Sequence, residues 1–171
     1  DFAPHQAHTI MSITKTMIHL IIGRCVEDGL IDLRATVCDY LPEIGSGYAD
    51  ATIQDVLDMN IVNHYSEDYS DPHTTALLHN VSMGWRLPAA DTSPTSNREF
   101  LCTIESNDLL NRSGEVHYKS ASTDVLAWVA ERVSSQSLRD YLVRIVEAAG
   151  IEHTFHMSTD HTGVPNANGG A

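Results

Sequence analysis

The chain has 171 residues, 42% of them hydrophobic, and a formal net charge of −13 at pH 7. Such a chain can bury a sizeable core and is too apolar to be disordered, so we expect a single domain over residues 1–171. Nucleic acid and an anionic membrane surface are both excluded as expected partners, because each needs clustered Lys and Arg. No apolar run reaches the roughly 18 residues of a membrane span. We therefore expect a soluble chain that acts on a small molecule, with the compartment open and the cytoplasm favoured.

Helical patterns dominate the chain. The run from Ile10 to about Asp28 is apolar on nearly every side and predicts a central, buried helix that Gly29 is placed to end. Further helices are expected over residues 52–59, 73–83, from about 96, 121–133 and 137–149, with a turn-rich segment over 30–52 and a polar turn over 111–114. Strand patterns are nearly absent, residues 115–118 being a weak candidate.

Histidine spacing raises the question of a metal site. Two pairs share an HxxH spacing, His5 with His8 and His153 with His156. Both pairs lie in expected loops, whereas zinc ligands usually sit on rigid elements beside a carboxylate base. We therefore expect no metal and no other cofactor.

One of the two lysines of the chain lies inside the first apolar run. Ser12 and Lys15 are three residues apart, which places both side chains on one face of a helix. A serine becomes a nucleophile when a base removes its proton, and burial favours the neutral lysine that could do so. The spacing alone also fits a structural alternative, in which a lysine beside a helix cap extends its amine toward solvent.

The motifs together resemble a known superfamily. "SITK" is followed in order by "IIGRCVEDGLIDLRATVCDYLPE", "ATIQDVLDM", "YKSASTDVLAWVAERVSSQSL" and "DHTGVPNANGG". This succession resembles the serine beta-lactamase and penicillin-binding-protein superfamily, and within it the branch of 6-aminohexanoate-dimer hydrolases and beta-lactamase-like esterases. The resemblance runs over most of the chain.

The resemblance implies a serine hydrolase that cleaves an amide or ester through an acyl-serine intermediate. Ser12 would be the nucleophile, Lys15 the general base and Tyr118 the proton relay to the leaving group. Ser120 takes the place of the asparagine found in many relatives and would contact the substrate, as would Trp85 on a loop.

The chain departs from the superfamily pattern in two ways. His161, Thr162 and Gly163 match the third motif of the superfamily in letters, but no strand pattern follows them, so we interpret this match as a decoy. The superfamily fold is a three-layer α/β structure, and the strands that would bracket the helices are missing from this sequence. We therefore expect a mainly α chain that corresponds to the helical region of that fold, with most of the antiparallel sheet missing.

Several alternatives stay open at this point. The chain could be a D,D-peptidase of the penicillin-binding type, or an incomplete or degenerate helical domain in which Ser12 and Lys15 only pack. Besides an amide or ester substrate, its partners could be the missing sheet segments or another copy of the chain.

Overall fold

A computed structural model of the chain describes residues 3, 6–71, 73–90, 93, 95–106, 114–152 and 154–171. Its elements are the 3-10 turn η1 (Met11–Ile13) and the helices α1 (Thr14–Glu27), α2 (Val37–Tyr40), α3 (Ser46–Ala49), α4 (Ile53–Leu57), α5 (Thr75–Ser82), α6 (Asn97–Cys102), α7 (Ser120–Ser134) and α8 (Leu138–Ala149). Within the described ranges, extended pairing is limited to two isolated bridges, Thr36 with Thr52 and Thr159 with Pro165. The predicted mainly α class is confirmed.

The weak strand candidate at 115–118 is wrong. These residues are extended but belong to no strand. The backbone N–H of His117 donates to the carbonyl of Met59, and the segment leads into α7. Because a strand needs a neighbouring ladder, one such hydrogen bond does not make a sheet edge. The predicted turn at 111–114 lies outside the described residues apart from Gly114.

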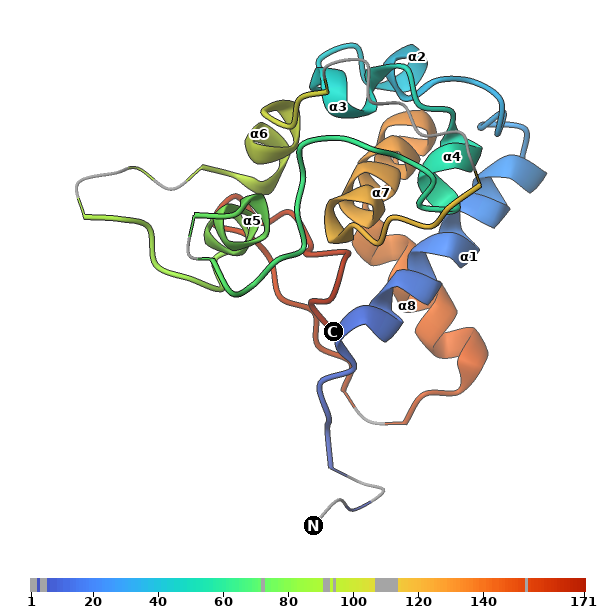
Figure 1. Cartoon of the computed structure of the whole chain (residues 1–171). Coiled ribbons are helices and arrows are strands. Elements are labelled where there is room, and N and C mark those ends of the chain that lie inside the picture. Colours follow the sequence, from blue (N-terminus) through green and yellow to red (C-terminus); the bar gives the residue numbers. More distant parts are fainter. Residues whose placement is uncertain are drawn as a thin grey trace.

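Helix α7 is the central element (Figure 1). Helix α1 packs along it, α4 and α2 lie toward one end, α6 contacts its side, and α8 contacts both α7 and α1. All residues from Ser120 to Ala130 of α7 are buried. This all-round burial explains its largely apolar, alanine-containing sequence, since small side chains let several helices approach one axis.

The burial of α1 differs from the prediction. The helix ends at Glu27, just before Gly29 with its left-handed φ of 73°, as expected. However, Ile13 and Leu20 are 67% and 58% exposed, while Ile18 and Ile22 on the packed side are almost fully buried. The expectation of burial on all sides was wrong, because α7 and α8 cover one face of α1 only.

Local capping explains several of the shorter helices. Thr52 and Asp55 form the predicted capping box before α4, and Ser96 with Glu99 forms the one before α6. The segment between α1 and α4 is turn-rich as predicted, although it also contains the four-residue helices α2 and α3. The expected long helices at the end of the chain correspond to α7 and α8, and Gly150 ends α8 with a φ of 63°.

The C-terminal stretch returns to the beginning of α1 (Figure 1). The carbonyl of Ala171 accepts hydrogen bonds from the backbone N–H groups of Ile10 and Met11, at 3.0 and 3.3 Å. Residues 166–169 of this stretch are buried. Two segments that are far apart in sequence therefore meet at the turn that carries Ser12.

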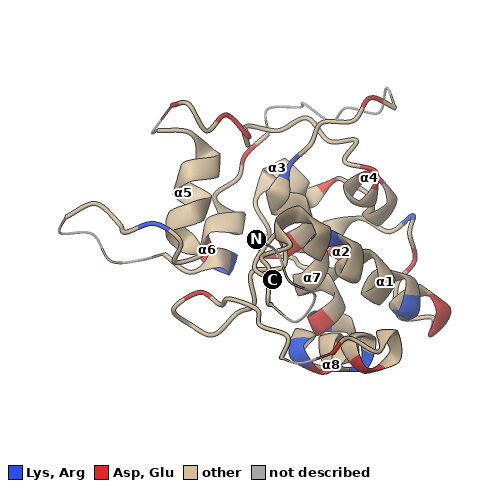
Figure 2. Cartoon of the chain, turned by 90° about the horizontal axis from the view of Figure 1, so that it is seen from below, with Lys and Arg blue, Asp and Glu red and all other residues tan. Residues whose placement is uncertain are grey.

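Charged residues are distributed over the loops and helices rather than gathered at one place (Figure 2). Arg24 pairs with Asp28 at 2.7 Å, and Arg98 pairs with Glu131 at 2.5 Å. In the part of the chain that the structure describes, no helix is long and apolar enough to cross a membrane.

Candidate active site

The backbone places Ser12 in an uncommon setting. Met11, directly before it, has a left-handed φ of 47°, and Ser12 follows within the single turn η1 at the start of α1. A residue with a side chain at positive φ is infrequent, and such positions cluster at functional sites. The two backbone hydrogen bonds from Ile10 and Met11 to Ala171 hold this conformation.

Lys15 lies beside Ser12 as the spacing predicts. Its Nζ donates a hydrogen bond to Ser12 Oγ at 2.9 Å and a second, short one to the backbone carbonyl of Asn168. The residue is 6% exposed. The amine is therefore held within the protein and directed at the serine, and does not extend to solvent as the structural alternative requires.

Tyr118 is the second group on the serine. Its Oη donates to Ser12 Oγ at 2.7 Å, and Lys15 Nζ lies 5.2 Å from the centroid of its ring. Burial acts to raise the pKa of Tyr118, but hydrogen bonding with Lys15 and Ser12 and the charge of Lys15 outweigh it and hold the pKa below its usual range. Tyr118 thus contacts, from 106 positions away, the serine oxygen that Lys15 also contacts.

Ser120 begins α7 two residues after Tyr118. Its backbone N–H donates to Glu67 Oε1 at 2.6 Å, and the other oxygen of Glu67 accepts from the Tyr69 hydroxyl at 2.6 Å. Burial, together with the Glu67 carboxylate, raises the pKa of Tyr69 to about 12. A carboxylate at a helix N-terminus is favoured by the unpaired N–H groups and the dipole. Glu67 thereby ties the loop before α5 to the segment that carries Tyr118.

Trp85 lies next to the turn of Ser12. The residue is 40% exposed, and its Nε1 donates to Ser158 Oγ at 3.1 Å. A Cβ added to Gly169 would lie 3.4 Å from Trp85 Cη2 and 3.6 Å from the carbonyl carbon of Met11. The indole therefore flanks the C-terminal stretch where that stretch contacts Met11.

The structure thus brings four groups together at one end of α1 and α7: Ser12, Lys15, Tyr118 and the start of α7 at Ser120. Sequence reasoning missed Asn168 and Glu67. Asn168 contacts Lys15 across 153 positions, and Glu67 contacts Ser120 across 53, so local spacing carries no sign of either.

The remaining candidate motifs lie elsewhere. His161, Thr162 and Gly163 occupy an exposed turn in which Asp160 accepts from the Thr162 backbone N–H at 2.8 Å. His5 and His153, one member of each histidine pair, fall outside the described residues. The described residues contain no group of three or more His, Cys, Asp or Glu that could hold a metal ion.

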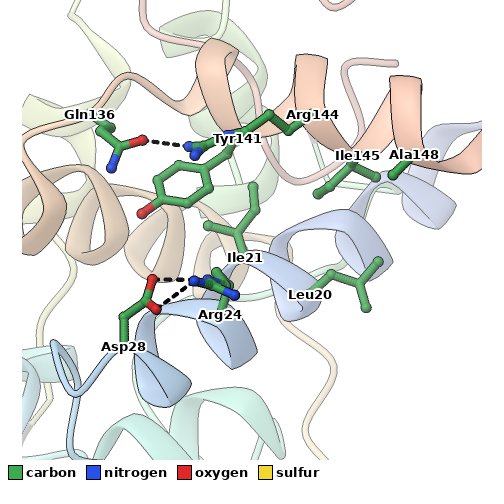
Figure 3. A pocket seen from close by; sticks show the side chains of 9 residues that line it. All are labelled: Leu20, Ile21, Arg24, Asp28, Gln136, Tyr141, Arg144, Ile145 and Ala148. Carbon is green, nitrogen blue, oxygen red and sulfur yellow. Dashed lines mark hydrogen bonds and ion pairs between the residues drawn. The ribbon is translucent and has the colours of Figure 1, made fainter.

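A separate cavity of about 370 Å³ opens between α1 and α8 (Figure 3). Leu20 and Ile21 of α1 face Tyr141 and Ile145 of α8 across it. Arg24 is paired with Asp28 at its edge. Ser12, Lys15 and Tyr118 are not among the residues that line this cavity, so it is distinct from the site at the start of α1.

Comparisons with known proteins identify the family of the chain. A family model described as Beta-lactamase matches residues 2–168. The 6-aminohexanoate-dimer hydrolase of Paenarthrobacter ureafaciens is 37% identical over 174 residues, which cover 99% of this chain and 43% of the relative. The chain therefore spans less than half the length of that relative.

Solved structures show the same fold. A Bacillus anthracis protein assigned as a 6-aminohexanoate-dimer hydrolase matches with a TM-score of 0.75 and 21% identity, over 99% of this chain and 45% of its own. A D-stereospecific amidohydrolase from Streptomyces matches with a TM-score of 0.61 and 20% identity, over 84% and 42%. The helices correspond to the helical region of the beta-lactamase-like fold, as predicted. With a family model that matches nearly its whole length, the chain belongs to the Beta-lactamase family.

Proposed function

We propose that the protein is a serine hydrolase that cleaves an amide or ester through an acyl-serine intermediate. The observation that carries the proposal is the convergence of Lys15 Nζ and Tyr118 Oη on Ser12 Oγ, at 2.9 and 2.7 Å. A nucleophile needs a base within hydrogen-bond reach, and both groups satisfy that distance. The family membership supports the same chemistry.

Acylation follows from this geometry. Ser12 Oγ attacks the substrate carbonyl while the amine of Lys15 takes its proton. Tyr118 lies within hydrogen-bonding reach of both Lys15 and Ser12, so the proton can pass through its hydroxyl to the departing nitrogen or oxygen. The Oγ–carbon bond forms as the carbon–nitrogen or carbon–oxygen bond of the substrate breaks. Water then releases the acyl group by the reverse transfers.

The substrate would lie over Ser12 between the start of α7 and Trp85. Ser120, which is 8% exposed, is the proposed polar contact there, and Trp85 offers a partly exposed aromatic face. Polar groups fix orientation and aromatic surfaces supply contact area in small-molecule sites. The 37% identical relative is named for hydrolysis of a dimer of 6-aminohexanoate, which favours an amide as the substrate.

The first test is the intact mass of the chain after incubation with a fluorophosphonate probe, with circular dichroism showing that each protein is folded. We expect one adduct on the wild type and none on Ser12→Ala. Ser134→Ala is the matched control, because this serine lies at the far end of α7 and donates to the carbonyl of Ala130. Folded wild-type protein without an adduct would contradict the proposal.

A further inference from the structure

A buried polar network lies directly behind Lys15. Asn168, whose carbonyl accepts from Lys15, is itself held by Asp124. Its backbone N–H donates to Asp124 Oδ1 at 3.2 Å, and its side-chain amide donates to Asp124 Oδ2 at 2.5 Å. Asn168 and Asp124 are 3% and 4% exposed. Both oxygens of one carboxylate thereby hold Asn168, one through its backbone N–H and the other through its side-chain amide.

His79 completes the network from α5. Its Nε2 lies between two acceptor oxygens, 3.1 Å from Asp124 Oδ2 and 3.0 Å from Asn97 Oδ1, and its Nδ1 lies 3.1 Å from the hydroxyl of Tyr65. Burial raises the pKa of Tyr65 far above its usual range, so Tyr65 keeps its proton and can donate it to Nδ1. Because both neighbours of Nε2 are acceptor oxygens, the N–H of Nε2 is shared between Asp124 and Asn97. The ring of His79 stacks on Phe100 with centroids 4.9 Å apart, which fixes its plane.

The position of Asp124 links the two halves of the candidate site. It lies on α7, fewer than two turns after Tyr118, while Lys15 lies on α1. A hydrogen-bonded route runs from α7 through Asp124 and Asn168 to the amine of Lys15. The carboxylate of Asp124 is therefore placed to set the position of the Lys15 amine relative to Tyr118, which directly precedes α7.

A contribution to stability is a poor explanation for the buried pair of Asp124 and His79. Removing a carboxylate from water costs free energy that its partners only partly restore, and apolar replacements of buried ion pairs are often neutral or stabilising. A catalytic base, in contrast, needs a fixed position to within fractions of an ångström. Asp124 and His79 bury their polar atoms where they can supply that precision.

We propose that Asp124 and His79 are positioning residues, which clamp Asn168 so that its carbonyl holds the amine of Lys15 against Ser12. The inference rests on the proposed function, since it assigns Lys15 the role of base. It predicts that loss of the clamp lowers the rate of serine acylation and leaves substrate binding unchanged.

The test uses Asp124→Asn, which keeps the side-chain volume but presents an NH2 group to partners that are themselves donors. We expect kcat for a nitrophenyl ester to fall by about 10- to 100-fold, with KM within about twofold of wild type. Asp160→Asn is the matched control. Asp160 is equally buried and accepts from the backbone N–H groups of Asn97, Thr162 and Val164 rather than from Asn168. It therefore meets the network at the backbone of Asn97, whose side-chain oxygen contacts His79, and does not hold Asn168.

If Asp124→Asn does not fold, two variants of His79 test the positioning role instead. His79→Gln keeps an N–H donor that can face Asp124, whereas His79→Leu removes it. We expect His79→Gln to retain most of the rate of fluorophosphonate labelling and His79→Leu to lose about tenfold, with both folded by circular dichroism. Partial restoration by glutamine is not expected from a general loss of packing.

The outcomes separate this inference from the proposed function. A wild type that is not labelled at Ser12 overturns both. A labelled wild type with Asp124→Asn equal to it in kcat, or His79→Leu equal to it in labelling rate, overturns the positioning role alone. A parallel rise in KM, or an equal loss in Asp160→Asn, would assign the network to stability and would also overturn the role.

Discussion

The surroundings of the two lysines, Lys15 and Lys119, are alike in most respects and differ in one. Both residues are buried, at 6% and 8% exposure, and each donates to a distant backbone carbonyl, of Asn168 and Tyr65 respectively. Each also lies over a tyrosine ring, at 5.2 and 5.9 Å from the centroid. Burial, a carbonyl and an aromatic face therefore do not distinguish a candidate catalytic base from a structural lysine.

The difference lies in what else each amine can reach. Lys15 donates to the hydroxyl of Ser12, which Tyr118 also contacts. Among the described residues, no serine hydroxyl is a hydrogen-bond partner of the Lys119 amine. The neighbouring tyrosines also diverge, since the pKa of Tyr118 is held below its usual range and that of Tyr65 is raised by burial. In the proposed mechanism, the hydroxyl of Ser12 that Lys15 and Tyr118 both contact makes the first arrangement a proton-transfer chain.

Replacing each lysine by methionine gives the largest contrast. Lys15→Met removes the proposed base and should lower the rate of Ser12 labelling by at least about 10³-fold, near the upper range for general-base catalysis. Lys119→Met should change it by less than about threefold. The check is the second-order rate of fluorophosphonate labelling, with folding verified for both variants. Equal losses in the two variants would contradict the distinction between the lysines.

Removing the hydroxyl of Tyr118 should have the next largest effect. Tyr118→Phe keeps the ring over Lys15 but removes the donor 2.7 Å from Ser12 Oγ, so we expect kcat to fall by about 10²-fold. Tyr40→Phe is the control, because the Tyr40 hydroxyl accepts from the backbone N–H of Asp32, away from Ser12. Steady-state hydrolysis of a nitrophenyl ester measures both. A Tyr118→Phe variant with unchanged kcat would remove Tyr118 from the proton relay.

The ionisation of Tyr118 should depend on Lys15. Burial opposes ionisation of this phenol, while hydrogen bonding and the charge of Lys15 favour it and lower the pKa. Lys15→Met removes the hydrogen bond and the charge of Lys15 and leaves burial and the hydrogen bond with Ser12, so the pKa of Tyr118 should rise. The measurement is the tyrosinate absorbance against pH, with the curve of Tyr118→Phe subtracted in each background. An unchanged midpoint would show that Lys15 does not set this ionisation.

Local sequence was enough to predict the capping boxes and the proximity of Ser12 and Lys15 in the candidate site. Thr52 with Asp55 and the Ser12–Lys15 spacing both involve residues three positions apart, whose geometry one helical turn determines. The role of Tyr118 came from the family resemblance, because no local rule connects residues 106 positions apart.

The contact of Asn168 with Lys15 depends on packing between distant segments, which the sequence pattern does not encode. Asn168 lies in a stretch without helical or strand periodicity, and its contact with Lys15 exists because residues 166–171 pack at the start of α1. Similarly, the exposure of Leu20 could not be predicted from its apolar neighbours. Periodicity shows which residues favour burial, while the arrangement of the helices decides which of them are covered.

The smallest expected effect concerns the pH dependence of stability at Lys119. Desolvation lowers its pKa in the folded state, although Glu67 acts in the opposite direction. The unfolded chain then binds more protons than the folded one between the lowered pKa and the ordinary lysine value, so this group makes stability rise with pH in that window. In urea unfolding, the free energy of unfolding of the wild type relative to Lys119→Met should therefore increase from pH 7.5 to pH 9.5. If the difference in free energy of unfolding between wild type and Lys119→Met stays constant or decreases, the amine of Lys119 is not desolvated in the folded chain. The two lysines would then resemble each other in their contacts but not in the solvation of their amines.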